Sequence, residues 1–521
     1  FFTEGTELFS KGDLFYSRRV GGSPSGSVAL ADNEEIDQYP GSVDLINALK
    51  ISGRTDKGLG IGFFNAITER TDAKIRNTDT GEIRSEMVEP FTNYNVFVLD
   101  QRFGDNSSVS LVNTNVIRDG DFRDANATGL YTSLTNNKNT MNYWASAEGS
   151  WVLEDETKFG VEGDAGLSKI NGKHRISAEI SFRTKDYDIN DLGYSTQTNR
   201  ITYYGYYGYR YLQPKGFLNN LYLNFNLRLN RRLDPDLYNN FVFNFNSSFT
   251  TKKFFNFGGG FETTPFQTND IYEPRVEGRF VKVPTYYNPW VWLETDYRKK
   301  LALSVVFDWY KYDEQGRGLF SVDFSPTYRV SDKFRLNFST NVTLSDKEQG
   351  FVNFENDQII FGQRDRNTII NSLESTYIFN NKMSLNLAFR HYYSDVIYDK
   401  FYDLDSDGSL AVNNYLGNHD ATYNSWNVDL RFAWWFAPGS QMTLLYRNAT
   451  ENYLPIARQS FNNNFSDLFD QPQLNSLSLR ISYYLDYNRV KNWFNAKQMP
   501  NTPTISTRKM GVNQTGFVTT Q

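Results

Sequence analysis

The stretch Leu221-Tyr-Leu-Asn-Phe-Asn-Leu-Arg-Leu-Asn230 decides the fold class, because its apolar and polar residues alternate without interruption. Successive side chains of a β-strand point to opposite faces, so one face of this segment is apolar and the other is mainly asparagine. The same alternation recurs in Leu301–Tyr310, Lys333–Leu344, Met383–Arg390, Trp426–Trp434 and Leu477–Asp486. The sequence therefore predicts an all-β protein built from amphipathic strands.

The composition excludes several other classes of protein. Aromatic residues make up 16% of the 521 residues, which is too many for a disordered chain. No run of about 18 apolar residues occurs, so helical membrane spans are not expected. There are no cysteines, which excludes disulfides, thiolate metal sites and cysteine catalysis. The net charge of −6 gives no general reason to expect nucleic acid as a partner.

Amphipathic strands fit either a soluble sandwich or a transmembrane barrel, and three features favour the barrel. The strands are long, at about 10–14 residues, as a tilted membrane crossing requires. Aromatic residues cluster near strand ends, as at Trp434-Trp435-Phe436, which is typical of interfacial girdles. Short and long connections also alternate. We therefore expect a transmembrane antiparallel β-barrel.

Short, often basic connections recur at ten places: Thr55–Lys57, Gly104–Asn106, Asn136–Lys138, Ile170–Lys173, Gln213–Gly216, Thr251–Lys253, Arg298–Lys300, Ser331–Lys333, Asn380–Lys382 and Ala437–Ser440. They join about twenty strands, and Leu14–Val20 and Leu474–Asp486 would add one each, giving about 22 strands (range about 20–24). An even count places both termini in the periplasm. The predicted parts are a periplasmic lead-in (1–13), the barrel (14–487) and a periplasmic tail (488–521).

The N-terminal motifs resemble a family of outer-membrane barrels. Phe1-Phe-Thr-Glu-Gly-Thr-Glu-Leu-Phe9 and Leu14-Phe-Tyr-Ser-Arg-Arg-Val-Gly21 look like its opening. Gly53–Gly62, Pro90–Gln101 and Ser110–Asn115 are similar to its next hairpins. The resemblance implies a barrel in the outer membrane of a Bacteroidota-type, Gram-negative bacterium. Family members usually carry a preceding module like a family 9 carbohydrate-binding domain, and we do not expect such a module within residues 1–521. The resemblance implies no activity.

One loop motif predicts a metal site. Asp403-Leu-Asp405-Ser-Asp407-Gly408 places carboxylates at positions 1, 3 and 5 and glycine at position 6, which matches the first half of a calcium loop. The glutamate expected at position 12 is replaced by Asn414. The alternative interpretation is a solvated acidic loop.

Candidate lumen or binding residues are Arg18, Tyr204, Tyr206, Asp308 and Asp429. Tyr204 and Tyr206 belong to a tyrosine-dense strand that forms either a ligand-stacking wall or ordinary lumen packing. Arg18 and Arg19 would point to opposite faces of a strand. Arg18 then either attracts anions into the lumen or pairs with a carboxylate such as Asp308 or Asp429, which we favour.

Signals for catalysis are weak. His419-Asp420 lies in an outward loop, as an outer-membrane hydrolase could use, but the candidate partners Ser394 and Asp395 cannot be placed beside it. Phosphate-binding loops, dinucleotide fingerprints and His-rich metal spacings do not occur.

Three functions remain in order of preference. The first is a binding or scaffolding subunit of a larger envelope assembly, the second is a substrate-selective channel for oligosaccharides or peptides, and the third is an outer-membrane hydrolase. The expected partners are membrane lipid and lipopolysaccharide, together with other outer-membrane or periplasmic proteins. The expected location is the outer membrane. Calcium is the one cofactor that the loop motif predicts.

Overall fold

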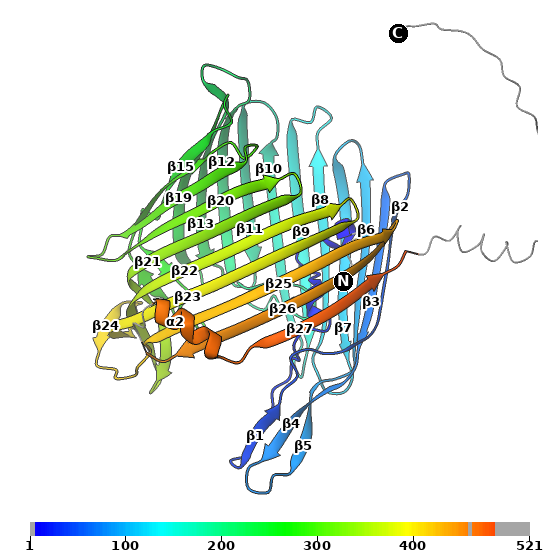
Figure 1. Ribbon diagram of the computed structural model, residues 1–521, viewed down its shortest axis with the longest axis vertical. Coiled ribbons are helices and arrows are strands. Elements are labelled where there is room, and N and C mark those ends of the chain that lie inside the picture. Colours follow the sequence, from blue (N-terminus) through cyan, green and yellow to red (C-terminus); the bar gives the residue numbers. More distant parts are fainter. Residues whose placement is uncertain (1–5, 457–460, 485–521) are drawn as a thin grey trace, which may run out of the picture.

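The computed structural model describes residues 6–456 and 461–484, and it is built almost entirely of strands (Figure 1). The main sheet consists of β2 (Leu45–Arg54), β3 (Leu59–Thr68), β6 (Thr92–Phe103), β7 (Ser107–Arg118), β8 (Asp124–Thr135), β9 (Met141–Leu153), β10 (Lys158–Lys169), β11 (His174–Arg183), β12 (Arg200–Tyr211), β13 (Leu218–Arg232), β14 (Leu237–Thr251), β15 (Asn256–Thr263), β18 (Tyr286–Glu294), β19 (Leu301–Tyr312), β20 (Gly318–Ser331), β21 (Phe334–Glu355), β22 (Gln358–Asn380), β23 (Met383–Leu404), β24 (Leu410–Asn413), β25 (Ala421–Ala437), β26 (Ser440–Leu454) and β27 (Leu474–Ser482).

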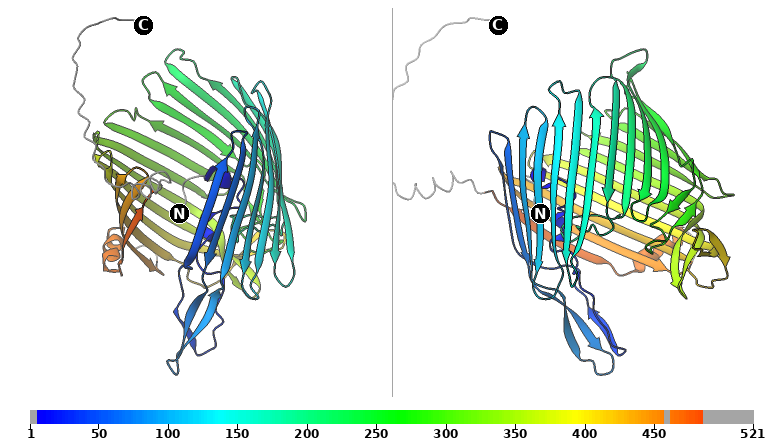
Figure 2. Two further views of the ribbon diagram at one scale, coloured as in Figure 1. Left: turned by 90° about the vertical axis from the view of Figure 1, so that its right-hand side faces the viewer. Right: turned by 180° about the vertical axis from the view of Figure 1, so that it is seen from behind.

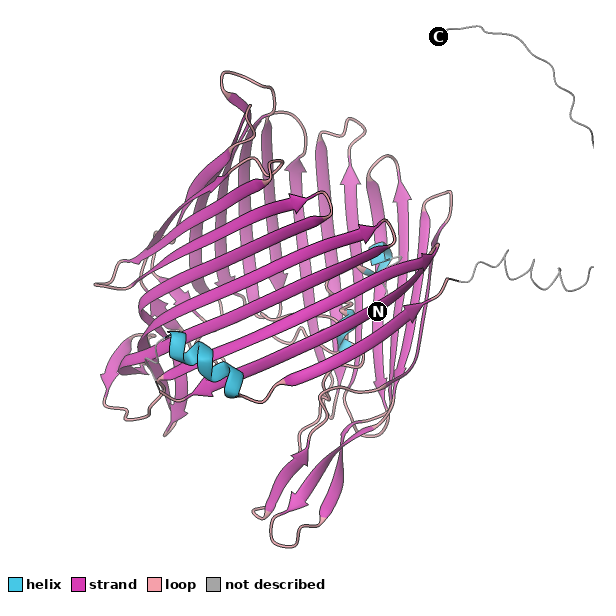
Figure 3. Cartoon of the chain, viewed as in Figure 1, coloured by secondary structure: helices cyan, strands magenta, loops and turns pink. Residues whose placement is uncertain are grey.

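Smaller elements flank this sheet. β1 (Glu34–Gln38), β4 (Thr71–Asn77) and β5 (Ile83–Glu89) form a three-stranded sheet that projects from one end (Figure 2). β16 (Thr268–Asp270) and β17 (Val281–Val283) form a hairpin. The helices are short: α1 (Thr6–Phe9), α2 (Phe461–Asp467) and the 3₁₀ turns Ser17–Arg19 and Leu468–Asp470 (Figure 3).

The main sheet is an antiparallel meander of 22 strands that pair in chain order, with β24 attached only to the outer end of β23. A hairpin turn occurs at each of the ten predicted short connections. These turns lie at one end of the sheet, called here the short-turn end, and the longer connections lie at the opposite, long-loop end. The predicted antiparallel all-β fold is confirmed.

The sheet curls round, but it is not closed by strand pairing (Figure 2). Pairing begins with β2 against β3 and ends with β26 against β27, and no pairing of the described residues joins β27 to β2. Without β24 the number of strands is odd, so β2 and β27 run in the same direction. The structure thus has two free edges where the sequence predicted closure.

The segment Leu14–Val20 was predicted to be a strand, and this prediction is wrong. It contains the 3₁₀ turn Ser17–Arg19 and lies against the inner face of the sheet, inside the curve. A strand would have exposed either Arg18 or Arg19 on the apolar face, whereas here Arg19 donates to Asn190 and Gly193. The predicted tail, 488–521, lies outside the described residues.

The two faces of the sheet differ in polarity as the alternation predicts. On β13, Leu223, Phe225 and Leu227 lie on the outer face, where Phe225 contacts Tyr207 and Phe245 of the neighbouring strands. Asn224 and Asn226 lie on the inner face. β13 therefore turns an apolar surface outward and a polar surface inward, whereas the inner faces of β3, β6, β7 and β8 carry buried apolar residues.

Candidate functional site

The inner face carries hydrogen-bonded rows of side chains that cross several strands. The longest row starts at Tyr204, whose hydroxyl donates to Asn226 at 2.7 Å. Asn226 donates to Asn244 at 3.1 Å, and Asn244 donates to Glu262 at 3.1 Å. The hydroxyl of Tyr286 completes the row with a 2.6 Å bond to Glu262. Because each amide has a partner one strand away, the wall is both polar and rigid.

A second row runs beside the first. The hydroxyl of Tyr206 donates to Asn224 at 2.7 Å, and Asn224 donates to Asn246 at 2.8 Å. Tyr204 and Tyr206 are thus hydrogen-bonding members of the polar wall. That their rings stack on a ligand stays a prediction.

The remaining predicted lumen residues are not gathered with the tyrosines. Asp308 of β19 accepts a hydrogen bond from Asn288. Asp429 of β25 accepts hydrogen bonds from Nε and Nη2 of Arg447, both at 2.7 Å. Arg18 is exposed in the 3₁₀ turn, 5.9 Å from the ring of Tyr16. Among the described residues Arg18 forms no ion pair with Asp308 or Asp429, and it lies in the 3₁₀ turn instead of on a strand of the sheet.

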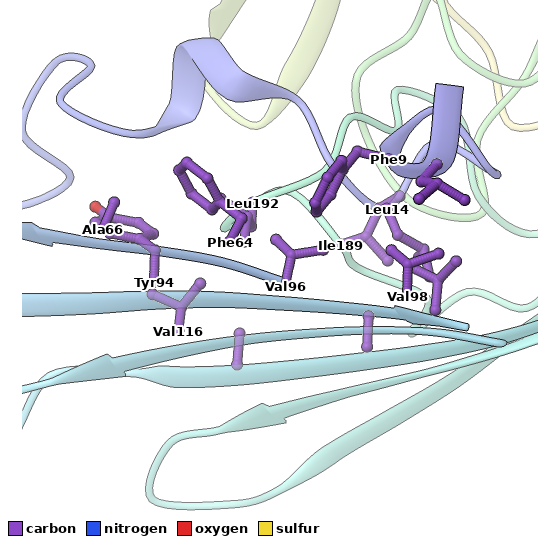
Figure 4. Close-up of a cluster of buried hydrophobic side chains, with 14 of the residues drawn as sticks. Phe9, Leu14, Phe64, Ala66, Tyr94, Val96, Val98, Val116, Ile189 and Leu192 are labelled. Carbon is purple, nitrogen blue, oxygen red and sulfur yellow. The ribbon is translucent and has the colours of Figure 1, made fainter. Parts of the chain in front are cut away.

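The N-terminal segment, residues 6–22, crosses the inner face of the first strands (Figure 4). At the short-turn end, Glu7 pairs with Arg54 at 3.2 Å and also with Arg102. Lys11 pairs with the fully buried Asp100 at 3.4 Å. Leu14 is completely buried and belongs to an apolar cluster with Phe9 and with the inner faces of β3, β6, β7 and β8.

The connection between β11 and β12 folds inward and holds this segment in place. The backbone amide of Tyr16 donates a 2.7 Å hydrogen bond to the carbonyl of Leu192 in this connection. The backbone amide of Tyr194 donates a 3.0 Å hydrogen bond to the carbonyl of Asp13. Ile189 and Leu192 pack into the same cluster as Leu14 (Figure 4). The segment is thus clamped between the sheet and an inward-folded loop.

Ion pairs anchor that loop to its neighbours. Asp191 pairs with Arg118 at 2.8 Å and also with Arg123, and Arg123 pairs with Asp188 at 2.9 Å. Burial alone would raise the pKa of Asp188, but the hydrogen bonds from the Asn190 amide and from Arg123 outweigh it and lower that pKa. The Asp188 carboxylate therefore stays charged at neutral pH.

The predicted calcium motif forms the hairpin turn between β23 and β24. Asp407 pairs with Lys282 of β17 at 2.8 Å and accepts a 2.9 Å bond from the amide of Ser409. Asp403, on β23, accepts a 2.6 Å bond from Asn413 of β24, and Asp405 accepts one from Ser409 at 3.4 Å. Lysine is thus the cation beside Asp407, and calcium binding here stays a prediction from the sequence.

His419 lies in an aromatic cluster, and its Nε2 is 2.9 Å from the hydroxyl of Tyr415. Asp420 accepts a 2.7 Å bond from the amide of Tyr398. Ser394 lies on β23, 3.4 Å from the hydroxyl of Thr368. Ser394 and His419 share no hydrogen bond in the described part of the chain.

A cavity of about 550 Å³ opens near the long-loop ends of β23, β25 and β26. Arg390, Tyr392 and Ser425 line it, together with Tyr423 and Glu451, which are joined by a 2.9 Å hydrogen bond. Sequence reasoning missed these residues. The alternation along β23, β25 and β26 could have assigned these residues to the inner face. Only the pairing of the strands shows that they lie next to one another.

A family model described as a domain of unknown function, DUF5916, matches residues 1–494. The chain belongs to this family. No curated protein matches the sequence. Membership of the DUF5916 family assigns no activity. The bacterial group and the preceding carbohydrate-binding module that the resemblance implies stay predictions.

No helix among the described residues of the DUF5916 chain is long and apolar enough to cross a membrane. Within residues 6–456 and 461–484, no three His, Cys, Asp or Glu side chains form a group that could hold a metal ion.

Proposed function

We propose that this chain is an outer-membrane protein whose curled sheet spans the bilayer as a β-barrel. The polarity of the two faces supports this proposal. Outer-face residues of central strands are widely exposed, such as Leu227 (45%), Val291 (46%) and Leu301 (51%). An apolar belt of that extent is costly in water and favourable in lipid. Lipid would cover the outer face, with lipopolysaccharide near the long-loop end.

Within that membrane we propose a binding or scaffolding role in a larger envelope assembly. The observation that carries this role is the pair of free edges at β2 and β27. Outward residues on both edges are strongly exposed, including Ile51 (60%), Leu477 (70%) and Leu479 (61%). Unpaired backbone groups in hydrocarbon cost several kcal/mol each, so an edge in the bilayer needs a cover. A partner subunit that adds to these edges would supply it.

Cysteine crosslinking tests the scaffold role, because the chain contains no native cysteine. Leu49→Cys or Ile51→Cys is combined with Leu477→Cys, Leu479→Cys or Ile481→Cys, and native membranes are oxidised. If a partner subunit covers the two edges, little intramolecular disulfide should form in any combination. A partner protein should also co-purify in fixed stoichiometry in mild detergent.

The opposite result would be efficient intramolecular disulfide formation and purification as a solitary chain. The two edges would then meet each other, and the scaffold role would lose its support. The proposal that the sheet spans a membrane would remain.

A substrate-selective channel is the second candidate, and the polar rows of the inner face favour it. Asparagine and tyrosine side chains such as Asn226 and Tyr204 present hydrogen-bonding groups along the wall. The N-terminal segment occupies the inner face of β3, β6, β7 and β8, so an open path would have to run along the opposite wall. Ion conductance in planar bilayers distinguishes the channel from the scaffold.

A further inference from the structure

The short-turn end of the sheet carries a ring of exposed positive charge. Eight of its ten turns contain lysine or arginine between the strand ends, and all of these basic side chains are exposed. The basic residues are Lys57, Lys138, Lys173, Lys215, Lys252, Lys253, Arg298, Lys299, Lys300, Lys333 and Lys382. The acidic residues of the same ten turns are only Asp56, Asp105, Asp296 and Asp332.

This excess is opposite in sign to the rest of the chain. The whole protein has a net charge of −6, so the acidic residues are concentrated elsewhere. The connection between β9 and β10, for example, begins Glu154-Asp-Glu at the long-loop end, and that between β13 and β14 contains Asp234 and Asp236. The short-turn end of the sheet is therefore basic and the long-loop end acidic. Such a division is expected when the two ends face surroundings of different charge.

Exposed aromatic and apolar residues stand beside the basic ones. Phe217 (66%) follows Lys215, Tyr297 (58%) precedes Arg298, and Trp435 (49%) lies close to a turn. The guanidinium of Arg298 lies 3.4 Å from the ring centre of Phe254, which links two neighbouring turns. Amphipathic rings at the border of an apolar belt sit at the level of lipid head groups.

One basic residue in the ring is already neutralised. Arg298 donates to both oxygens of Asp296 at 2.9 Å, and these hydrogen bonds hold the pKa of Asp296 at about 2. Lys299 and Lys300 next to it, and Lys252 and Lys253 on the adjacent turn, have no carboxylate partner among the described ion pairs. These four lysines form the densest part of the ring.

We propose that the ring of basic residues at the short-turn end binds the anionic head groups of phospholipids in the adjoining leaflet. The inference rests on the proposed membrane-spanning sheet. A lipid surface fits better than an acidic protein, because the charges follow the rim through eight turns instead of forming one patch, and each sector adjoins the apolar belt. Basic residues near an anionic membrane surface each strengthen binding severalfold.

Native mass spectrometry from neutral detergent micelles tests the proposal, with phosphatidylglycerol and phosphatidylcholine of equal chain length as probes. The wild type should bind phosphatidylglycerol at least about tenfold more tightly. The quadruple variant Lys252→Gln, Lys253→Gln, Lys299→Gln, Lys300→Gln should lose most of that preference. Replacing the same four lysines with arginine should keep it.

A matched control removes four exposed lysines from the long-loop end: Lys74→Gln, Lys158→Gln, Lys185→Gln and Lys400→Gln. The control should bind phosphatidylglycerol like the wild type. An equal loss in the control, or no preference in the wild type, would overturn the proposal. Far-ultraviolet circular dichroism establishes that each variant is folded.

Failure of this inference is distinguishable from failure of the proposed function. Each variant is also assayed for its need of detergent and for co-purifying partners. A wild type that stays monomeric and soluble without detergent would remove the membrane proposal itself. A detergent-dependent protein without lipid preference would remove only the role of the basic ring.

Discussion

At the scale of the residue, Asp407 shows how a carboxylate expected to bind metal is satisfied within the fold. Hydrogen bonds from Lys282 and Ser409 hold the pKa of Asp407 well below its ordinary value of 3.8. Lys282 belongs to β17, which is 125 residues away in sequence. The ion pair ties the β16–β17 hairpin to the turn after β23.

We predict that Lys282→Gln raises the pKa of Asp407 toward 3.8. Because the pKa of Asp407 is lowered, the ion pair stabilises the folded protein fully at pH values above the ordinary aspartate pKa. This stabilisation is lost as the pH falls through the lowered pKa. The wild-type turn should therefore keep its ion pair at pH values near 3.8, whereas the variant carboxyl, which keeps only the hydrogen bonds from Ser409, should take up its proton at a higher pH than in the wild type. Carbon-detected NMR of labelled aspartate measures both titrations, with Lys400→Gln as control. Identical curves for Asp407 in wild type and Lys282→Gln would contradict the assignment.

At the scale of the element, the N-terminal segment is held by burial as well as by charge. Leu14 is fully buried between the sheet and the loop that contains Ile189 and Leu192. Phe9 and Phe15 extend the same contact, with Phe15 at 5.1 Å from the ring of Phe64. A segment that crosses the inner face thus behaves as a part of the core.

We predict that Leu14→Ala lowers the free energy of unfolding by about 2–5 kcal/mol, because it leaves a cavity among apolar side chains. Ser17→Ala, an exposed change in the same segment, should cost less than about 0.5 kcal/mol. Denaturant unfolding in detergent micelles measures both values. Equal effects of the two changes would show that the segment does not contribute to the folded core.

At the scale of the whole molecule, the decisive feature is which face of the sheet meets which solvent. Val305 and Val306 are adjacent on β19 and both partly exposed. Val305 pairs with Leu293 and Phe324 on the outer face, whereas Val306 shares the inner face with Asp323. Substitutions of these two valines therefore compare the outer face with the inner face of the sheet.

We predict that Val305→Arg destabilises the protein in lipid by roughly 2–4 kcal/mol, the cost of an arginine facing the bilayer centre. Val306→Arg should cost less than about 1 kcal/mol, since a charge on the polar face stays hydrated and near Asp323. Unfolding in lipid vesicles compares the two variants. A larger cost for Val306→Arg would mean that the apolar face is not the lipid face.

Alternation in the sequence was sufficient to predict long amphipathic strands of the main sheet and the ten short turns, because strand periodicity and turn chemistry are local properties. The small strands β1, β4, β5, β16, β17 and β24 were not predicted. Leu14–Val20 misled the same reasoning. Leu14, Phe15 and Val20 look like strand residues, but their partners are residues 189–194, which no local pattern reveals. The contact between Asp407 and Lys282 was hidden for the same reason.

The order of residues alone determined the all-β class, the antiparallel meander and the opposite polarity of the two faces, since each follows from neighbours one or two positions apart. Tertiary structure alone decided that β2 and β27 remain free edges and that the N-terminal segment lies inside the curve. It also decided which inner-face groups meet, as Tyr423 meets Glu451. These features depend on the curvature and register of 22 strands, which accumulate along the whole sheet and are encoded at no single position.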